Sequence, residues 1–210
     1  MKTTFFTIAF LFIGFASSGQ DGNKEFKTIF SGNGLRSNGA YGGITTGYTQ
    51  VANRDAILLG AHGAWLINHR FGLGFGGTAF VTEGKDDLQL NSRYSLAGGY
   101  GGLRMEFIAF PESPIHVTFP LLIGAGGVTY SEMGRDYSIG REEDTRAFFV
   151  TEAGAELGLN LIKFMRLSFG LSYRYTSDVN LTYFEGGNAI VDKDALRGMS
   201  GSISLKFGKF

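Results

Sequence analysis

The sequence predicts an all-β fold, a single eight-stranded antiparallel up-and-down β-barrel that crosses a membrane. The 210 residues contain 33 Gly, 20 Phe and 9 Tyr but only 3 Pro, and this composition suits strands with tight turns and close contacts. Apolar residues alternate with small or polar residues along eight segments, which is the period of a strand with two different faces. The links between the segments are alternately short and long along most of the chain, which indicates an up-and-down order.

The N-terminal residues have the layout of a secretory signal peptide. Lys2 provides a positive start, Phe5–Phe15 is an apolar run, and the letters ASSG offer small residues for cleavage just before Gln20 or Asp21. The alternative is a membrane anchor, but the run is shorter than the ~18 apolar residues that a spanning helix needs. We therefore expect a signal peptide over residues 1–20, a periplasmic leader or linker over 21–39, and the barrel over 40–210.

Eight segments carry the alternation, and each is long enough to be a membrane strand. They are, in order, Ala40–Val51, Ala56–Ile67, Phe71–Thr82, Tyr94–Phe110, Ile115–Tyr130, Arg146–Leu161, Met165–Thr176 and Met199–Phe210. Most exceed the ~5–6 residues of an ordinary strand, and each reaches the ~9–11 residues that a tilted membrane strand requires. Pro120 lies inside the fifth segment, where we expect a bulge because proline lacks the N–H that a ladder needs.

The links predict one end with tight turns and one end with long loops. Tight links lie around the letters NHR, PESP and NLIKF, and the short link ANRD breaks the pattern at the other end. The remaining links are long and charged: Glu83–Arg93, Ser131–Thr145 and Ser177–Gly198. In hydrocarbon every backbone N–H and C=O must be paired, so we expect the last strand, with its seam at Gly201–Phe207, to pair with the first and close the barrel.

The two faces of the segments differ in bulk and charge. One face is apolar, with residues such as Leu73, Phe107, Phe119 and Leu205. The other is mainly Gly and Ser, which is too poor in charge for a water-exposed surface, since such surfaces carry roughly 25–35% charged residues. A narrow interior requires small residues and paired ions, so we expect the bulky face to meet lipid. Arg166 shares the second face with the six residues that we expect to form a structural network inside the lumen: Arg104, Glu106, Glu152, Glu156, Arg174 and Lys206.

Composition excludes several kinds of chemistry. The absence of Cys excludes disulfides, thiolate metal sites and a cysteine nucleophile, and a formal charge of zero without a basic stripe excludes a nucleic-acid partner. Gly72–Gly77, GLGFGG, spells a nucleotide-binding pattern, but more strand follows where a helix is needed. The acidic runs GREEDT and DKDA lack the spacing of an EF-hand loop, so we expect solvated loops, no metal and no cofactor.

The titratable residues do not predict a catalytic set. Glu152 and Glu156 lie four apart on one strand face, ~13 Å at the usual rise, which is too far for a glycosidase pair. His62 faces the predicted lumen without a Ser or Asp partner in its own segment, and His69 and His116 lie beside tight turns. We therefore expect a protein that is not an enzyme.

The signal peptide, the eight amphipathic segments and the final aromatic residue together resemble small outer-membrane β-barrel proteins of Gram-negative bacteria. The stretches GAYGG and GGYGG are most similar to uncharacterised barrel families of the Bacteroidota, and the resemblance covers about Ala40–Phe210. It implies an outer-membrane location and a C-terminal insertion signal, Phe207 and Phe210, that the barrel-assembly machinery reads. Such proteins usually carry a second aromatic residue two positions before the last, where this chain has Gly208.

We expect a structural or surface-interaction role for a monomer whose lumen is filled by a polar and ionic network. Its partners would be outer-membrane lipid, the barrel-assembly machinery and, at the long loops, an extracellular ligand. Three alternatives remain open at this point. They are a narrow channel for small solutes, a lipid-active outer-membrane enzyme and a soluble ligand-binding barrel.

Overall fold

The computed structural model describes residues 38–88, 90–133, 139–183 and 188–210. The predicted signal peptide and almost all of the predicted linker therefore lie outside the described residues. The strands of these ranges are β1 Asn38–Val51, β2 Arg54–Ile67, β3 Phe71–Thr82, β4 Lys85–Asp87, β5 Ser92–Ala109, β6 Ile115–Met133, β7 Ile139–Ile162, β8 Met165–Thr176 and β9 Gly198–Lys209. No helix in the described ranges is long and apolar enough to cross a membrane.

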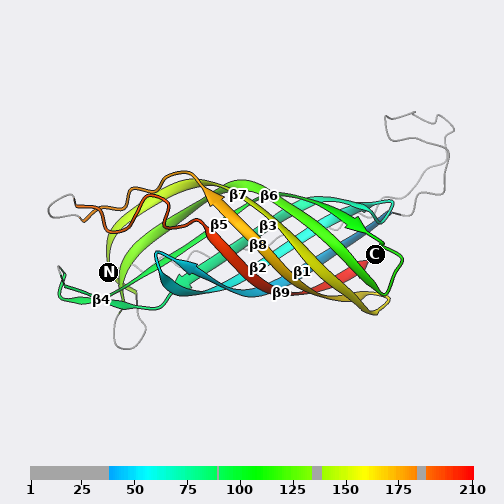
Figure 1. Cartoon of the computed structure of the whole chain (residues 1–210), viewed down its shortest axis with the longest axis horizontal. Coiled ribbons are helices and arrows are strands. Elements are labelled where there is room, and N and C mark those ends of the chain that lie inside the picture. The colour runs from blue at the N-terminus through cyan, green and yellow to red at the C-terminus, as the bar shows by residue number, and fades with distance from the viewer. Residues whose placement is uncertain (1–37, 89, 134–138, 184–187) are drawn as a thin grey trace, which may run out of the picture. The chain divides into compact units, whose positions relative to one another are not determined.

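Eight long strands close into an antiparallel barrel, which confirms the predicted fold class (Figure 1). The neighbours around the wall run β3, β2, β1, β9, β8, β7, β6 and β5, and the pairing of β5 with β3 completes the circle. β9 pairs with β1 from Ala40↔Lys209 to Thr49↔Ser200, so the predicted seam lies within this ladder. Closure leaves no free edge along the wall, as a strand protein in hydrocarbon requires.

The barrel has two unlike ends. Links of residues 68–70, 110–114 and 163–164 lie at one end, which we call the turn end and where the C-terminus lies (Figure 1). The longer links meet at the other, the loop end. The short strand β4 pairs there with the start of β5, from Lys85↔Tyr94 to Asp87↔Ser92, inside the stretch predicted as a loop.

The predicted loop Ser131–Thr145 is mostly strand in the described residues, so that prediction is wrong. β6 continues to Met133 and β7 begins at Ile139, with the register shifting at Ser131. Alternation in sequence reports that one face of a strand is buried. The letters of Ser131–Thr145 do not alternate between apolar and polar residues, so the continued backbone pairing has no such signal in the sequence.

The bulge predicted at Pro120 is also absent. The β6–β7 register is the same on both sides of it, with Thr118 opposite Glu156 and Leu121 opposite Ala153. On the other side Glu106 faces Pro120 in regular register with β5. The missing proline N–H interrupts the ladder with β7 over two residues, and no extra residue is inserted.

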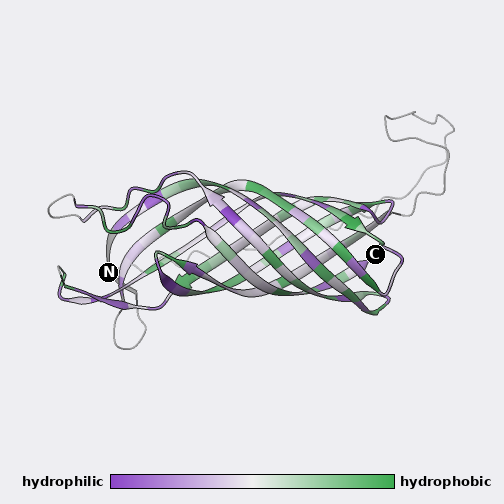
Figure 2. Cartoon of the chain, viewed as in Figure 1, coloured by the Kyte–Doolittle hydropathy of each residue, from purple (hydrophilic) through white to green (hydrophobic). Residues whose placement is uncertain are grey.

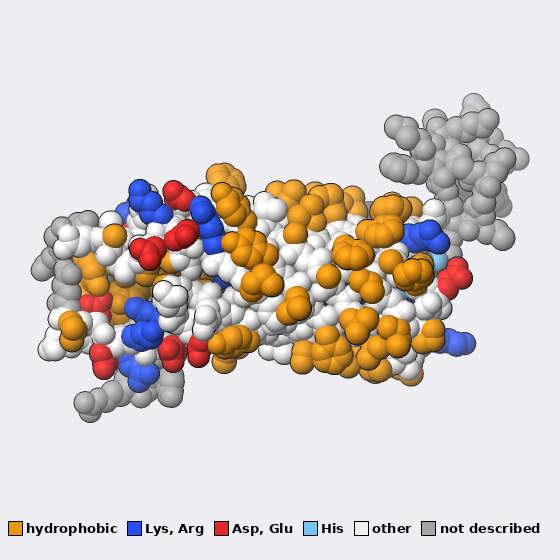
Figure 3. Space-filling model, in the orientation of Figure 1, with side chains coloured by type: hydrophobic (Ala, Val, Ile, Leu, Met, Phe, Trp, Pro, Cys, Tyr) orange, Lys and Arg blue, Asp and Glu red, His pale blue; other side chains and the backbone are white. Residues whose placement is uncertain are grey.

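The faces of the wall have the predicted orientation. Leu73, Phe107 and Phe119 point outward and are 51%, 40% and 49% exposed, whereas Glu156 and Lys206 are buried. Hydrophobic stretches recur along the strands in Figure 2, and hydrophilic residues are frequent in the links. Figure 3 shows hydrophobic side chains over the visible wall, with charged side chains gathered at the ends, most densely at the loop end.

Inside the barrel, two apolar clusters flank a polar middle. The loop-end cluster includes Phe80, Leu96, Phe148 and, from the link after β8, Val179, Leu181 and Leu196. The turn-end cluster consists of Tyr41, Ala64, Leu66 and Ile108, with Phe210 packed against it. The polar middle is therefore the part of the interior where charged and hydroxyl side chains of different strands meet.

Candidate functional site

An ionic network joins three strands across the polar middle. Glu156 on β7 accepts a hydrogen bond from Arg104 Nη2 on β5 at 2.7 Å and another from Lys206 Nζ on β9 at 2.6 Å. Arg104 Nε lies 3.6 Å from Glu106 Oε2, which also accepts from the Tyr41 hydroxyl at 2.8 Å. One carboxylate thus bridges two cations, and four of the six predicted network residues share a single cluster.

Glu152 and Arg174 do not join this network, which corrects the prediction of one cluster. Glu152 accepts hydrogen bonds from the hydroxyls of Tyr100 at 2.6 Å and Ser172 at 2.5 Å. Arg174 faces Glu152 in the β7–β8 ladder, but its Nε donates to the Leu196 carbonyl at 2.7 Å. The two side chains therefore do not form the expected ion pair, although both lie beside Tyr100, whose ring centroid is 5.5 Å from Arg174 Cζ.

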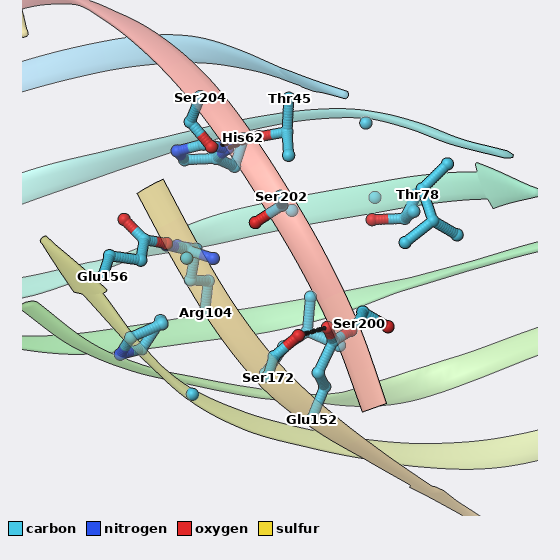
Figure 4. Close-up of a pocket in the computed structure, with 18 of the residues that line it drawn as sticks. Thr45, His62, Thr78, Arg104, Glu152, Glu156, Ser172, Ser200, Ser202 and Ser204 are labelled. Carbon is cyan, nitrogen blue, oxygen red and sulfur yellow. Dashed lines mark hydrogen bonds and ion pairs between the residues drawn. The ribbon is translucent and has the colours of Figure 1, made fainter. Parts of the chain in front are cut away.

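A cavity of about 70 Å³ lies beside the network (Figure 4). A water molecule needs roughly 10–15 Å³ of such space and two to four polar partners, so the cavity has room for several waters. Ser200 Oγ and His62 Nε2 have no protein partner within the described residues. The lining of this cavity is rich in hydroxyl groups, which belong to Thr45, Thr78, Ser172, Ser200, Ser202 and Ser204.

His62 contacts a hydroxyl that the sequence did not predict. Its Nδ1 lies 3.4 Å from Thr45 Oγ1 on β1, and Thr45 Oγ1 lies 2.8 Å from Ser204 Oγ on β9. These partners come from neighbouring strands, so inspection of the segment around His62 misses them. The other two histidines lie as expected beside tight turns: His69 is in a turn, and His116 is the second residue of β6 and is buried.

A cap formed by residues 177–183 and 188–197 folds into the loop end. Its Val179, Leu181 and Leu196 are at most 2% exposed in the loop-end cluster. Asp87 Oδ2 accepts hydrogen bonds from the hydroxyls of Tyr130 at 2.8 Å and Tyr183 at 2.7 Å. Burial, together with the nearby carboxylate, raises the pKa of Tyr183, so this hydroxyl stays a donor.

Asp144 attaches the cap to the wall. It lies where β7 extends past its ladder with β8, and its Oδ2 accepts from the Thr182 N–H at 2.9 Å and from Arg146 Nε at 3.0 Å. Burial alone would raise the pKa of Asp144, but these hydrogen bonds outweigh it and lower the pKa. Of the acidic run GREEDT, the side chains before Asp144 lie outside the described residues.

The two residues of the predicted insertion signal lie on opposite sides of the wall. Phe207 faces outward and is 43% exposed. Phe210 turns inward, where its ring stacks on Tyr41 at 5.5 Å between centroids and lies 3.9 Å from Arg166 Cζ. Their role in membrane insertion stays a prediction.

A solved structure has the same architecture. Neisserial surface protein A, NspA, superposes with a TM-score of 0.54 at 12% identity, over 83% of this chain and 99% of that one. The fold is that of the small outer-membrane β-barrels. Ail, the attachment invasion locus protein of Yersinia pestis, in complex with the heparin analogue sucrose octasulfate, gives a TM-score of 0.48 at 10% identity, over 81% and 97% of the two chains. No protein-family model matches the sequence, and no curated protein matches it.

Proposed function

We propose that this chain is an outer-membrane β-barrel with a structural or surface-interaction role, and that its loop end with the cap meets the outside of the cell. The observation that carries the proposal is a closed barrel with bulky apolar side chains outside and ion pairs inside. Leu59, Trp65 and Phe75, for example, are 67%, 60% and 73% exposed. In water such a wall would cause aggregation, whereas in a membrane the apolar side chains contact the lipid chains, which is favourable.

Two finer statements belong to the same proposal. The chain carries a cleaved signal peptide over residues 1–20, which delivers it for assembly, and it is a Bacteroidota-type barrel. The first is supported by the apolar run after Lys2 and the small residues that follow it, and the second by the stretches GAYGG and GGYGG.

A soluble ligand-binding barrel fits this structure poorly. A carrier of apolar ligands would place residues such as Leu73 and Phe107 inside and its charged side chains in water. The wall has the reverse arrangement, with both residues exposed and Glu156 buried between two cations. This orientation favours the membrane protein over the carrier.

We also propose that the protein is not an enzyme. His62 is the histidine nearest a hydroxyl pair, and it lies in the polar middle between the two apolar clusters rather than at the loop end. A lipid-active enzyme needs its base at a rim that substrate can reach. A His62→Ala variant that lost a measured hydrolase activity of the wild-type barrel would contradict this part of the proposal.

Labelling of single introduced cysteines tests which end of the barrel faces outward. The native chain has no Cys, so each variant carries one labelling site. Lys193 is exposed in the cap and Lys163 is exposed at the turn end, so Lys193→Cys and Lys163→Cys form a matched pair. In intact cells a membrane-impermeant maleimide should label the first variant, and should label the second only after the outer membrane is permeabilised. Equal labelling of both in intact cells, or recovery of either protein in the soluble periplasmic fraction, would contradict the proposal.

A further inference from the structure

A second cavity lies at the turn end, apart from the cavity of the polar middle. It has a volume of about 440 Å³ and is lined by Pro111, Asn160, Ile162, Lys163, Arg166 and Phe210. None of these residues lines the cavity beside the ionic network. We call it the turn-end pocket.

Arg166 is a buried cation with no hydrogen-bonded or ionic partner within the described residues. It is 6% exposed, and one face of its guanidinium packs on the ring of Phe210 at 3.9 Å. A guanidinium carries five N–H donors in a plane, and stacking on an aromatic face satisfies none of them. None of its nitrogens is a fully enclosed atom without a partner, so the edge of the guanidinium opens to the pocket, where an acceptor from outside the fold can reach it.

The side-chain neighbours of Arg166 in the described residues make no hydrogen bond to it, although the charge of the buried Glu106 partly offsets that of Arg166. Asn160 and Lys206 face it in the two adjacent ladders, and Lys206 is paired with Glu156 at 2.6 Å. The Asn160 amide donates from Nδ2 to the Ser113 carbonyl at 2.9 Å, and its buried Oδ1 has no protein partner among the described residues.

The charge of the lining favours an anion. Arg166 and Lys163 contribute two positive charges, no carboxylate side chain of the described residues lines the pocket, and the main-chain carboxylate of Phe210, the last residue of the sequence, offsets one of the two. Glu112 follows Pro111 in the turn but is exposed and is not part of the lining. An anion with more than one oxygen can satisfy the planar donors of Arg166 in a bidentate manner, which a single-atom ion cannot do.

We propose that the turn-end pocket binds a phosphate group. Arg166 donates two parallel N–H bonds to it, Lys163 adds the second charge, and Asn160 Oδ1 accepts from a hydroxyl on the phosphate or on the molecule that carries it. At about 440 Å³ the pocket is larger than one phosphate, so the carrier has room beside Pro111 and Ile162. The phosphate comes either from a phospholipid headgroup of the adjacent leaflet or from a small free phosphate compound. The site goes beyond the proposed surface role and does not depend on it.

Phosphate titration of the folded barrel tests the pocket directly. The protein is refolded in dodecyl maltoside, which carries no phosphate, and the side-chain Nε–H signal of Arg166 is followed by NMR as inorganic phosphate is added. We expect a saturable shift. Lys163→Gln should weaken binding severalfold, and Arg70→Gln, an exposed arginine in another turn at the same end, should leave it unchanged. Absence of saturation, or equal weakening by Arg70→Gln, would overturn the proposal.

Variants of Arg166 distinguish the effect of its planar set of N–H donors from the effect of its positive charge. For these variants the affinity is followed by calorimetry, and Arg166→Gln should weaken phosphate binding at least tenfold while Arg166→Lys restores only part of it. The unboiled gel mobility of each variant checks that it is folded, and Lys163→Gln, which changes an exposed side chain, keeps the test decisive should Arg166→Gln not fold. Phosphate affinity that is unchanged in a folded Arg166→Gln variant would refute the site.

Three further probes identify the source of the phosphate. Tighter binding of short-chain phosphatidylglycerol than of glycerol 3-phosphate would support the site and assign it to a lipid headgroup. Equal binding of the two would support the site and assign it to free phosphate compounds. Acetate binding as tight as that of phosphate would overturn the preference for phosphate.

Discussion

At the residue scale, Glu156 is the buried carboxylate that bridges two cations in the interior. It lies between Arg104 and Lys206, with both hydrogen bonds shorter than 2.8 Å. Removing one member of a buried ionic group leaves the other charges without compensation. Glu152, by contrast, accepts from the neutral hydroxyls of Tyr100 and Ser172 and from no cation among the described residues.

These two glutamates therefore respond differently to the same substitution. Glu156→Gln should lower the free energy of unfolding by about 3–5 kcal/mol, because two cations lose their counter-charge. Glu152→Gln keeps one acceptor oxygen for one of the hydroxyls, and its amide N–H can donate to the oxygen of the other hydroxyl, so it should cost about 1 kcal/mol. Guanidinium-induced unfolding of the barrel from lipid vesicles measures both. Similar losses for the two variants would show that charge pairing in the polar middle is not what stabilises it.

At the element scale, the strands and the cap obey different rules. A strand of the wall has one face in lipid and the other in the lumen, whereas the cap has its apolar residues inside and its polar residues in water. The links at the loop end that lie outside the cap also meet water: Leu88, in the link after β4, is 98% exposed there, whereas Leu59 on β2 is 67% exposed on the lipid-facing wall. An exposed apolar side chain is favourable on the wall, where it contacts lipid, but gains nothing at the loop end, where it contacts water.

A matched pair of substitutions tests this difference. Leu59→Arg should destabilise the barrel by roughly 2–4 kcal/mol when it is folded in lipid vesicles, because it places a charge in the lipid-facing wall. Leu88→Arg should change stability by less than about 0.5 kcal/mol, since surface substitutions in water are nearly neutral. Unfolding titrations compare the two. A small effect of Leu59→Arg would argue that this part of the wall faces water.

Acid should loosen the cap. The pKa of Asp144 is lowered in the folded protein, because hydrogen bonds from Thr182 and Arg146 outweigh its burial. The ionised carboxylate therefore stabilises the cap above its unfolded pKa, and this contribution is lost as the pH falls through the folded pKa. The protection factor of the Thr182 amide, which corrects the exchange rate for its intrinsic pH dependence, should be high at neutral pH and fall below the ordinary carboxyl range. Asp144→Asn should lower this protection factor at neutral pH and remove its fall in acid; an unchanged profile of protection against pH would contradict the attachment.

At the scale of the whole molecule, the filled interior favours a barrel without a pore. Apolar clusters lie at both ends of the polar middle, and the cap residues of the loop-end cluster are almost completely buried. We expect no steady conductance in planar bilayers at amounts where a reconstituted porin gives clear steps. Reproducible single-channel steps from the folded wild-type protein would instead support the narrow channel.

The amino-acid sequence was enough to predict the eight long strands of the wall and, in all of them except the first, the face on which the bulky residues lie. Period-two alternation is a local property of the backbone, so Arg104, Glu106, Glu156 and Lys206 could be placed in the lumen without any knowledge of their neighbours. Beyond the alternating segments that signal is absent, and β4 and the extension of β7 were missed for this reason.

Only the tertiary structure decided which of those residues meet. Arg104 and Glu156 are 52 positions apart, and their contact depends on the register of three strands. The inward turn of Phe210 onto Tyr41, the bond from Arg174 to Leu196 and the burial of the cap also depend on contacts between distant segments. These contacts cannot be predicted from the local sequence around either residue, because they form only when the closed barrel brings distant segments together.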